Sequence, residues 1–319
     1  MMRWNLLRFA SACLAVCAAA LIPAAAGAKS LPAQLRVLNT AGKVLADQTQ
    51  YTGTVRVQTS RAATCFGAGS AGSGNPVAIQ GPTALGIVQD ASATARSLRP
   101  LRITDAFSFG LGVCGFGGFG ASGAGFWYLK VDHKGAQVGG DQLRLRRNDD
   151  VLWYLSPGFP APAELFLAAP SQVAPGQAFG VRVFAYDDAG QRSPVSGARV
   201  AGAALPTGPD GRTTVTLSRS GKIRARHGAD IPSNSEFVCV RAGRGRCAGG
   251  SSELIAGSAR ADRIIGSANP DRVLARGGND RVNVRGGVGA DVVDCGPGRD
   301  VVVLDSRDRE RRCERTIRR

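Results

Sequence analysis

The chain has 319 residues and a formal net charge of +16; it contains 43 glycines, 6% aromatic residues and only two histidines. Abundant glycine with few aromatic side chains favours several small β-rich units over one large core, so we expect a mostly β, multi-domain protein. The two histidines, His133 and His227, fall in different predicted domains. The sequence also lacks a G-x-S-x-G elbow, an H-E-x-x-H helix and a phosphate-binding loop, and we therefore expect that the protein is not an enzyme.

The first 28 residues have the pattern of a secretory signal peptide. Arg3 and Arg8 give a basic start, an apolar run spans residues 14–22, and Ala26-Gly27-Ala28 supplies small residues for cleavage. No later stretch is long and apolar enough to cross a bilayer. We expect a secreted, extracellular protein.

Six cysteines follow the signal, and an even number outside the cytoplasm predicts disulfide bonds. Several pairings are formally open, and the sequence favours the sequential one because each bond then stays within one segment. The expected pairs are Cys65 with Cys114, Cys239 with Cys247, and Cys295 with Cys313.

The N-terminal domain, residues 29–156, begins with alternating apolar and polar residues. This alternation predicts half-buried strands over residues 34–38 and 51–57, with a hairpin-like crossing between them. Pro82-Thr83 starts a short helical stretch. The helix is expected to bury the face formed by Leu85, Val88 and Ala91 and to expose the side that includes Asp90.

The end of this domain has a more specific pattern. Residues 126–132 read F-W-Y-L-K-V-D, a glycine bend follows at 138–140, and Asn148-Asp149-Asp150 leads into V-L-W-Y. This order resembles the DUF4430 family, which is similar to the C-terminal β-grasp domain of transcobalamin and intrinsic factor. In that family's pattern, W-x-x-x-V-N-G … G-D-x-v-x-W, Asp132-His133-Lys134-Gly135 stands for V-N-G, and Asn148-Asp149-Asp150 for G-D. The resemblance implies a β-grasp fold.

Three aromatic side chains of these strands are ligand-binding candidates: Trp127, Tyr128 and Trp153. They form either a surface platform for a sugar or flat ligand or the packing of a small β core, which is the commoner role. The resemblance implies carriage of a small ligand, cobalamin-like or carbohydrate, although the helical barrel that holds most of the ligand in the vitamin carriers is absent.

A proline-punctuated linker, residues 157–163, leads to a second domain at 164–240. Short alternating strands separated by turn residues such as Asp187-Asp188 and Pro209-Asp210-Gly211 predict a β-sandwich. The pattern V-x-G-A-x-V … D-G-x-x-x-V-x-L resembles bacterial Ig-like domains, which implies a spacer or adhesive unit. The strands are expected at residues 164–168, 180–186, 198–200, 212–217 and 222–226.

The last domain, residues 251–319 after a linker at 241–250, contains a repeated aspartate. The five copies follow one another at intervals of 9, 9, 11 and 9 residues, and a β-branched residue stands two places after each. They are Asp262, Asp271, Asp280, Asp291 and Asp300, followed by Ile264, Val273, Val282, Val293 and Val302. A short fixed period joining an acid to an inward aliphatic predicts a parallel β-roll or solenoid, with a break in the stack at the 11-residue step.

Residues 286–294 read G-G-V-G-A-D-V-V-D and fit the nonapeptide G-G-x-G-x-D-x-U-x at every defined position. The tail therefore resembles the RTX (hemolysin-type) repeat family, whose turns hold calcium between stacked coils. Calcium prefers oxygen ligands from carboxylates and carbonyls, and glycine lets a turn direct its carbonyls at the ion. The earlier copies depart from the pattern, so we expect one weak site. Its candidate residues are Gly286, Gly287, Gly289, Asp291, Gly296, Gly298 and Asp300.

A metal-free ladder is the alternative. Arg263, Arg272 and Arg281 directly follow their aspartates. Pairs between these neighbours would neutralise the stacked charge without an ion.

The excess of arginine bears on partners. A net charge of +16 attracts polyanions such as an acidic cell-wall polymer or a polysaccharide, or nucleic acid without sequence specificity. A solvated arginine surface without a partner is the alternative. The arginines that concentrate at the C-terminus are Arg307, Arg309, Arg311, Arg312, Arg315, Arg318 and Arg319. The sequence thus predicts a secreted, non-catalytic binding or surface-structural protein with a calcium-type tail, or an extracellular small-ligand carrier.

Overall fold

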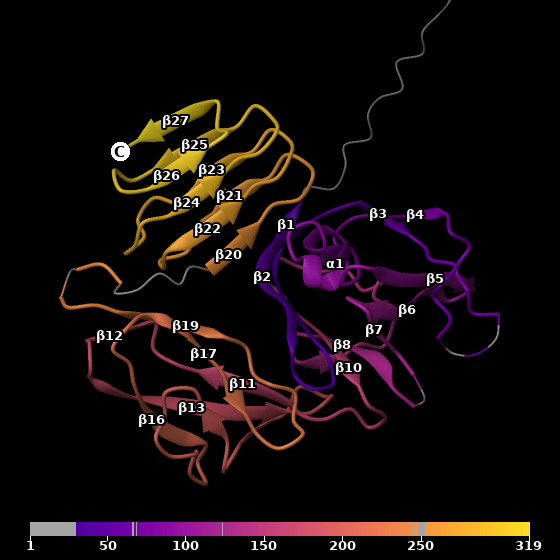
Figure 1. Ribbon diagram of the computed structural model, residues 1–319, viewed down its shortest axis with the longest axis horizontal. Coiled ribbons are helices and arrows are strands. Elements are labelled where there is room, and N and C mark those ends of the chain that lie inside the picture. The colour runs from indigo at the N-terminus through magenta and orange to yellow at the C-terminus, as the bar shows by residue number, and fades with distance from the viewer. Residues whose placement is uncertain (1–29, 66, 68, 123, 244, 248–252) are drawn as a thin grey trace, which may run out of the picture.

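A computed structural model describes residues 30–319 except 66, 68, 123, 244 and 248–252; the predicted signal peptide lies outside the described residues. The described chain is almost entirely β and contains both antiparallel and parallel sheets, which confirms the expected fold class. Three hydrophobic clusters define three regions. Figure 1 shows them as the N-terminal region (30–156, indigo to magenta), the middle region (164–240, pink to orange) and the C-terminal β-roll (253–319, orange to yellow).

The N-terminal region packs a mixed sheet against the short helix α1 (Gly86–Ala91). Within this sheet β2, β1, β10, β8 and β9 are successive neighbours, and the central pair β1 and β10 runs parallel. A 3-10 turn spans Arg96–Leu98. The strands are β1 (Leu31–Leu38), β2 (Val44–Thr52), β3 (Val55–Gln58), β4 (Pro76–Ile79), β5 (Leu101–Phe107), β6 (Gly110–Phe116), β7 (Phe119–Gly120), β8 (Phe126–Val131), β9 (Lys134–Gly135) and β10 (Asp150–Ser156).

Two expectations for this region are wrong. The strand expected at residues 51–57 is two strands, because the chain bends at Gly53-Thr54 between β2 and β3. Asp90 is buried at 7% exposure, because the β-roll covers this side of α1 and Arg276 of the roll reaches it. Burial raises the pKa of Asp90 to about 6.

The middle region consists of short sheets around one apolar cluster. β11, β13 and β14 form one sheet in which β16 also pairs with β13, β12–β19–β17 form a second, and β15 pairs with β18. Asp187 and Asp210 accept backbone N–H bonds within their own turns, as their turn chemistry predicts. The strands are β11 (Glu164–Ala168), β12 (Gln172–Val173), β13 (Ala178–Tyr186), β14 (Arg192–Pro194), β15 (Arg199–Val200), β16 (Arg212–Thr216), β17 (Gly221–Ile223), β18 (Ala225–Arg226) and β19 (Glu236–Val240).

The C-terminal repeats form a roll of two facing parallel sheets, with successive strands alternating between them. The β-branched residue after each aspartate points inward, and all five are at most 1% exposed. One sheet holds β20 (Glu253–Ala256), β22 (Asp271–Leu274), β24 (Val292–Asp294) and β26 (Arg309–Arg311). The other holds β21 (Arg263–Ile265), β23 (Arg281–Asn283), β25 (Val301–Leu304) and β27 (Arg315–Arg318).

The 11-residue step does not break the stack, contrary to the sequence prediction. β22 and β24 pair in parallel register, with Val273 opposite Val293. The two extra residues lie in the turn between β23 and β24, outside the paired strands. A turn can lengthen without disturbing a ladder whose hydrogen bonds lie between strands.

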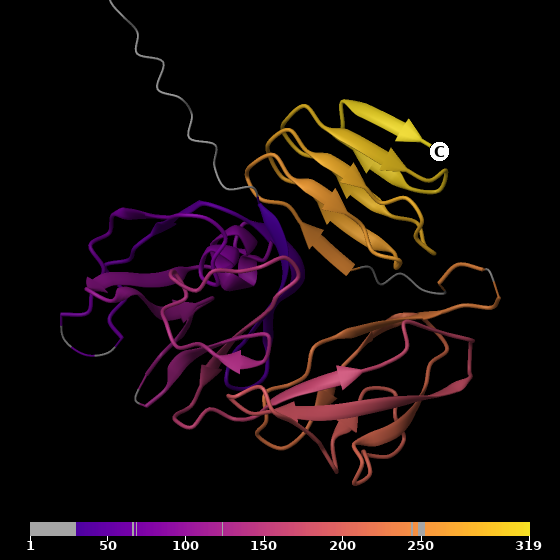
Figure 2. The same cartoon turned by 180° about the vertical axis from the view of Figure 1, so that it is seen from behind.

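The roll is joined to the N-terminal region at its first coil. β2 pairs in parallel with β20, with Thr49 opposite Ile255, so one nine-stranded sheet runs from β9 to β26 through both regions (Figures 1 and 2). Tyr51 of β2 is 3% exposed and belongs to the apolar cluster of the roll. Its hydroxyl accepts the Ile265 N–H at 3.3 Å. The N-terminal region therefore closes the first end of the roll core.

The last coil closes the other end with polar groups. Glu310 and Thr316 occupy the register positions of the inward residues Val293 and Val302. Glu310 forms an ion pair with Arg318 across the end of the roll. The disulfide between Cys295, which is fully buried, and Cys313 ties this coil to the one before it.

All three disulfides follow the sequential pairing, which confirms that prediction. The Cα–Cα distances are 5.1 Å for Cys65–Cys114, 5.0 Å for Cys239–Cys247 and 5.2 Å for Cys295–Cys313. These separations are ordinary for disulfide bonds.

Candidate metal centre

The aspartates of the repeat form two carboxylate columns, one along each edge of the roll, because a repeat of nine to eleven residues covers only half a coil. We call them the first edge (Asp262, Asp280, Asp300 and Glu314) and the second edge (Asp271, Asp291 and Asp308). On the first edge the backbone N–H of Asp262 donates to Oδ1 of Asp280 at 2.8 Å, and that of Asp280 to Oδ1 of Asp300 at 2.7 Å. The second edge repeats this arrangement between Asp271 and Asp291 at 2.8 Å. In each case, one carboxylate oxygen of the later coil accepts a hydrogen bond from the coil before it and so ties the two coils together.

Burial makes these carboxyl groups poor carriers of charge. The five repeat aspartates are at most 4% exposed. Burial, the largest cause, and repulsion from neighbouring carboxylates together raise the pKa of Asp271 to about 6 and that of Asp280 and Asp291 to about 7. A stack of such groups near neutral pH requires either protons or a cation.

Arginine does not meet that requirement, so the expected pairs between each aspartate and the arginine that follows it are wrong. Arg263, Arg272 and Arg281 are exposed on the outer faces of the sheets, since neighbours along a strand point to opposite sides. Among the described residues, none of the five repeat aspartates forms an ion pair with an arginine.

Serine side chains satisfy the first aspartate on each edge. Ser258 donates its backbone N–H to Oδ2 of Asp262 at 2.6 Å and its hydroxyl to Oδ1 at 3.1 Å. Ser267 makes the same pair of bonds to Asp271, at 2.6 and 2.8 Å. Ser30 of the N-terminal region also donates to Asp262. Both oxygens of these two carboxylates therefore have protein donors.

The later turns lack these serines. The position four residues before the aspartate is Arg276, Gly287 and Gly296 in the copies of Asp280, Asp291 and Asp300. Oδ2 of Asp280 and Oδ2 of Asp300 are buried without a hydrogen-bond partner. Buried carboxylate oxygens without a hydrogen-bond donor are the type of ligand atom that a hard divalent cation prefers.

On the second edge, Gly287 opens a comparable space beside Asp291. A Cβ at Gly287 would stand 3.4 Å from Oδ2 of Asp291 and 3.6 and 3.8 Å from the carbonyl oxygens of Asn269 and Ala268. One carboxylate oxygen and two carbonyl oxygens from the neighbouring turn thus surround a position that a side chain would fill. This mixture of oxygens fits calcium.

The residues expected from sequence to share one site lie on opposite edges. Gly286, Gly287 and Gly289 belong to the turn before Asp291 on the second edge, whereas Gly296 and Gly298 belong to the turn before Asp300 on the first. The two sets of glycines therefore belong to two different candidate sites. Each site is completed by the turn of the repeat two copies away on the same edge. The sequence reasoning did not assign Asp280, Ala268 and Asn269 to a site. Counting every second aspartate would have placed Asp280 with Asp300.

Comparison with known families bears on these turns directly. The family model described as the RTX calcium-binding nonapeptide repeat (4 copies) matches residues 248–282 and 256–293. The C-terminal region carries RTX repeats. The match includes the copies of Asp262 and Asp271, which depart most from the nonapeptide, and these repeats are calcium-binding elsewhere in the family. No curated protein and no solved structure matches the chain.

The RTX repeats and the three disulfides are both typical of extracellular proteins. No helix in the described part of the chain is long and apolar enough to cross a membrane.

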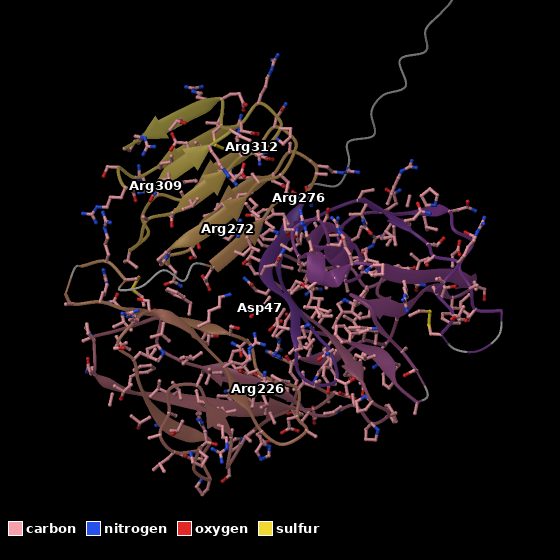
Figure 3. The ribbon with its side chains drawn as sticks, in the orientation of Figure 1. Asp47, Arg226, Arg272, Arg276, Arg309 and Arg312 are labelled. Atoms are coloured by element: carbon pink, nitrogen blue, oxygen red, sulfur yellow. A yellow bond between two sulfur atoms is a disulfide. The ribbon has the colours of Figure 1, made fainter. Side chains whose placement is uncertain are left out.

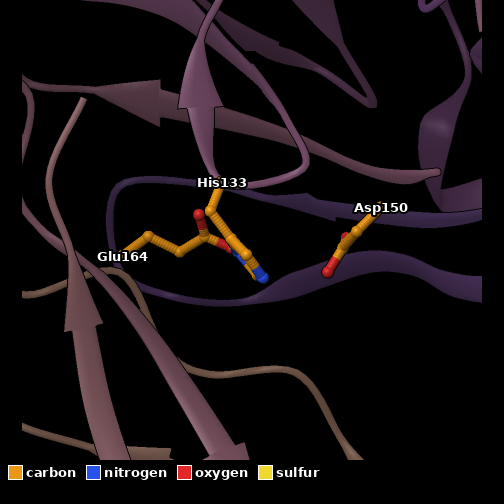
Figure 4. Close-up of side chains that lie close together, drawn as sticks. All are labelled: His133, Asp150 and Glu164. Carbon is orange, nitrogen blue, oxygen red and sulfur yellow. The ribbon is translucent and has the colours of Figure 1, made fainter. Parts of the chain in front are cut away.

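A second group of metal-ligating types lies outside the RTX repeats. His133, Asp150 and Glu164 meet between the N-terminal and middle regions, with ligand atoms within 4.8 Å of one another (Figure 4). Glu164 is paired with Arg36 and lies 3.5 Å from Nζ of Lys130, and all three side chains are at most 3% exposed. Burial alone would raise the pKa of Glu164, but His133 and the two cations lower it below its usual value. Arg36 and Lys130 both pair with Glu164, whereas burial raises the pKa of Asp150. The protein's own cations thus occupy Glu164, and we interpret the cluster as a charge network between the two regions rather than a metal site.

The aromatic candidates of the N-terminal region line a hollow of about 300 Å³. Trp127 and Trp153 are 7% and 3% exposed, and both pack against Phe116 in the core. Nε1 of Trp153 donates to the Ala84 carbonyl at 2.8 Å, whereas Nε1 of Trp127 is buried without a partner. The two indoles thus belong to the core, and one polar group beside the hollow is unsatisfied.

Proposed function

We propose that this is an exported, non-catalytic binding or surface-structural protein whose RTX repeats are stabilised by calcium. The observation that carries the proposal is the pair of buried, unpaired oxygens of Asp280 and Asp300 in a column of carboxyl groups with raised pKa values. The ion supplies the positive charge that the ladder lacks. The match of the repeats to a calcium-binding family supports the same conclusion.

Two positions are proposed for the ion, in place of the single site expected from sequence. On the first edge, Asp280 and Asp300 with the carbonyls of their glycine turns would hold it. On the second edge, Asp291 with the carbonyls of Ala268 and Asn269 would do so. The serine turns of Asp262 and Asp271 would hold their coils without an ion.

The mature chain with residues 29–319 is the right material for the test, since a fragment starting at residue 250 would lose β2 and Tyr51 from the end of the roll core. We expect calcium, but not magnesium at equal concentration, to raise the melting temperature relative to EGTA, because magnesium demands a smaller octahedral site. Equilibrium dialysis would count the bound ions. Equal melting curves in calcium and EGTA, with no bound ion, would refute calcium stabilisation.

The absence of catalysis is part of the proposal. His133 belongs to the buried charge network, and His227 pairs with Asp230 at 2.8 Å in a turn of the middle region. Among the described residues, the polar partners of these two histidines are the carboxylates of Glu164 and Asp230, which gives neither histidine a nucleophilic partner. Hydrolysis of generic ester, peptide or glycoside substrates above background would contradict this part.

A small-ligand carrier is the second candidate, favoured by the hollow beside Trp127. The β-grasp resemblance supports it, since β1 and β10 run parallel at the centre of the N-terminal sheet and α1 packs against β1 and β2 of that sheet. The Ig-like resemblance of the middle region would make that region a spacer. Titration of cobalamin and of neutral oligosaccharides should quench tryptophan fluorescence, and Trp127→Phe should remove the signal. Unchanged fluorescence at saturating concentrations of both would exclude them as ligands.

A further inference from the structure

A basic cleft lies between the N-terminal region and the RTX roll. It encloses about 340 Å³ and is lined on one side by β3, α1 and the segment that follows α1, and on the other by the first turns of the roll. This size falls within the range of pockets that hold small molecules. Its walls come from two regions that are distant in sequence, so the cleft exists only when both are folded and docked.

Four arginines line this cleft, and Asp90 is the one carboxylate among the lining residues. Arg56 and Arg99 come from the N-terminal region, and Arg260 and Arg276 come from the roll. The side chains of Arg56 and Arg260 are exposed and have no ion-pair or hydrogen-bond partner among the described residues. The cleft therefore keeps an excess of positive charge that the protein itself does not neutralise.

Two of the four guanidinium groups are held in place by backbone carbonyls. Nε of Arg99 donates to the Ser92 carbonyl at 2.6 Å. Nη1 of Arg276 donates to the Asp90 carbonyl at 3.1 Å and to the Gly257 carbonyl at 3.2 Å, and lies 3.4 Å from Oδ1 of Asp90. Figure 3 shows Arg276 at the boundary between the roll and the N-terminal region. These contacts fix the cationic groups before any ligand arrives, which lowers the entropic cost of binding.

The backbone of Arg276 carries strain that the repeat itself does not require. Its φ is +76°, in the left-handed region, and the equivalent residue before Asp300 is Gly296 with φ +87°. Glycine adopts this conformation without steric cost, whereas a residue with a Cβ does so at a cost of about 1 kcal/mol or more. Strained residues persist where the side chain has a role, and here the side chain crosses to the N-terminal region.

We propose that this cleft binds a small ligand through a phosphate or sulfate group, with Arg56 and Arg99 contacting it from the N-terminal region and Arg260 and Arg276 from the roll. Guanidinium groups match tetrahedral oxyanions in charge and in fork geometry. Because the ligand touches both regions, its binding stabilises their docking. The cleft borders the first edge, since Ser258 binds Asp262 and Arg276 stands in the turn of Asp280, but no carboxylate of either edge lines it. The inference therefore does not require calcium binding.

The test uses the mature chain in calcium, with sodium sulfate as the probe and ionic strength held constant with sodium chloride. Isothermal titration calorimetry should show saturable sulfate binding. The double variant Arg56→Ala/Arg260→Ala should weaken it at least about tenfold, since each lost charge-assisted contact is worth a factor of that order. The control Arg285→Ala/Arg299→Ala removes the same charge from exposed positions of the roll outside the cleft, and binding should stay within about twofold.

A further variant, Arg276→Gly, removes a guanidinium group while relieving the backbone strain. It should lose affinity for sulfate, and the melting temperature without sulfate is measured in parallel because the variant also loses the contacts to Asp90 and Gly257. No saturable heat with sulfate, or equal losses in the cleft and control double variants, would overturn the proposal. The first result would show no site and the second only a general effect of charge.

The source of the anionic group is distinguished by comparing sulfate, glucose 6-phosphate and glucose. Binding of the sugar phosphate tighter than sulfate, with no binding of glucose, assigns the cleft to phosphorylated small molecules. Equal binding of sulfate and the sugar phosphate assigns it to the free anion. Binding of glucose alone would contradict the role of the arginines.

Discussion

The first and later turns of the RTX roll share the ladder of N–H to carboxylate hydrogen bonds but satisfy the second oxygen of their aspartates differently. Asp262 and Asp271 are saturated by Ser258 and Ser267, and the first coil is paired with β2 of the N-terminal region. Asp280 and Asp300 stand farther along the roll, have glycine turns, and keep one buried oxygen unpaired. A serine can thus take the place of a metal ion as the partner of the aspartate where a neighbouring region already holds the coil. We propose that only the coils beyond that support require the ion.

The largest expected effect concerns the support of the first turns. Tyr51→Ala removes a ring that fills the end of the roll core, and we expect a loss of about 3–5 kcal/mol in the free energy of unfolding, with or without calcium. Tyr51→Phe is the matched control, since it keeps the ring and removes only the hydroxyl that accepts the Ile265 N–H. Urea denaturation of the mature chain measures both. Equal stabilities of the two variants would show that the end of the core does not depend on this ring.

The next effect concerns the later turns. Asp280→Asn with Asp300→Asn should abolish the first-edge share of the calcium-induced stabilisation, which is about 2.7 kcal/mol for one site at a hundredfold excess over Kd, and should leave the share of the second edge. In EGTA at neutral pH the double variant should be no less stable than the wild type, because it removes two buried carboxylates without a counterion.

Asp262→Asn is the comparison that sharpens this result. Serine donors already occupy both oxygens of Asp262, so its calcium response should remain close to that of the wild type. Differential scanning calorimetry of the wild type and both variants, in calcium and in EGTA, measures these calcium responses. A calcium response lost equally in the Asp262 variant would remove the distinction between the early and later turns.

A smaller effect is expected from pH. The folded-state pKa values of Asp271, Asp280 and Asp291 are raised to about 6, 7 and 7, above the ordinary value of an unfolded aspartate. Without calcium, the stability that these groups contribute is therefore fully present below about pH 4 and is lost as the pH rises to about 7. Asp90 and Glu236, raised to about 6 and 7, act in the same direction.

The response to calcium distinguishes the ladder carboxylates from Asp90 and Glu236. The rise in melting temperature caused by calcium should be larger at about pH 8 than at about pH 5, because at the lower pH protons compete for the same oxygens. Melting curves in calcium and EGTA across this range provide the measurement. A calcium increment independent of pH would mean that the carboxylates are ionised without the ion.

The smallest effect is expected for the arginines that follow the aspartates. Arg263→Ala, Arg272→Ala and Arg281→Ala should each change the free energy of unfolding by no more than about 0.5 kcal/mol, because the side chains are exposed and do not pair with the ladder. A loss of several times that value for any of them would revive the metal-free Asp–Arg ladder.

The sequence predicted the roll well because its signal is local. The spacing of the aspartates and the aliphatic residue two places later fix the strand period and the inward face, and all five aliphatic residues are buried as expected. The sequential disulfides were predictable for the same reason, since each closes a loop within one region. The β-grasp and Ig-like resemblances stay predictions.

Contacts between regions were not predictable from the sequence. The pairing of β2 with β20 joins segments about two hundred residues apart, and neither segment has a sequence pattern that indicates the other as its partner. Asp90 was expected on an exposed helix face because its neighbours alone gave no sign that Arg276 would cover it. The division of the glycine turns between two edges was also missed, since it depends on how many repeats make one coil rather than on any single repeat.

The closing of the last coil by Glu310, Thr316 and the Glu310–Arg318 pair has a consequence for the behaviour of the protein at high concentration. An open parallel coil is a template on which another chain can add its own strand. Here a second copy would have to bury a charged pair and face a like-charged set that includes Arg309, Arg311 and Arg315. The two ends of the roll are therefore protected against strand addition in different ways. The N-terminal region covers the first end, and charged side chains protect the other. We therefore expect this chain to stay dispersed rather than to form filaments through its roll.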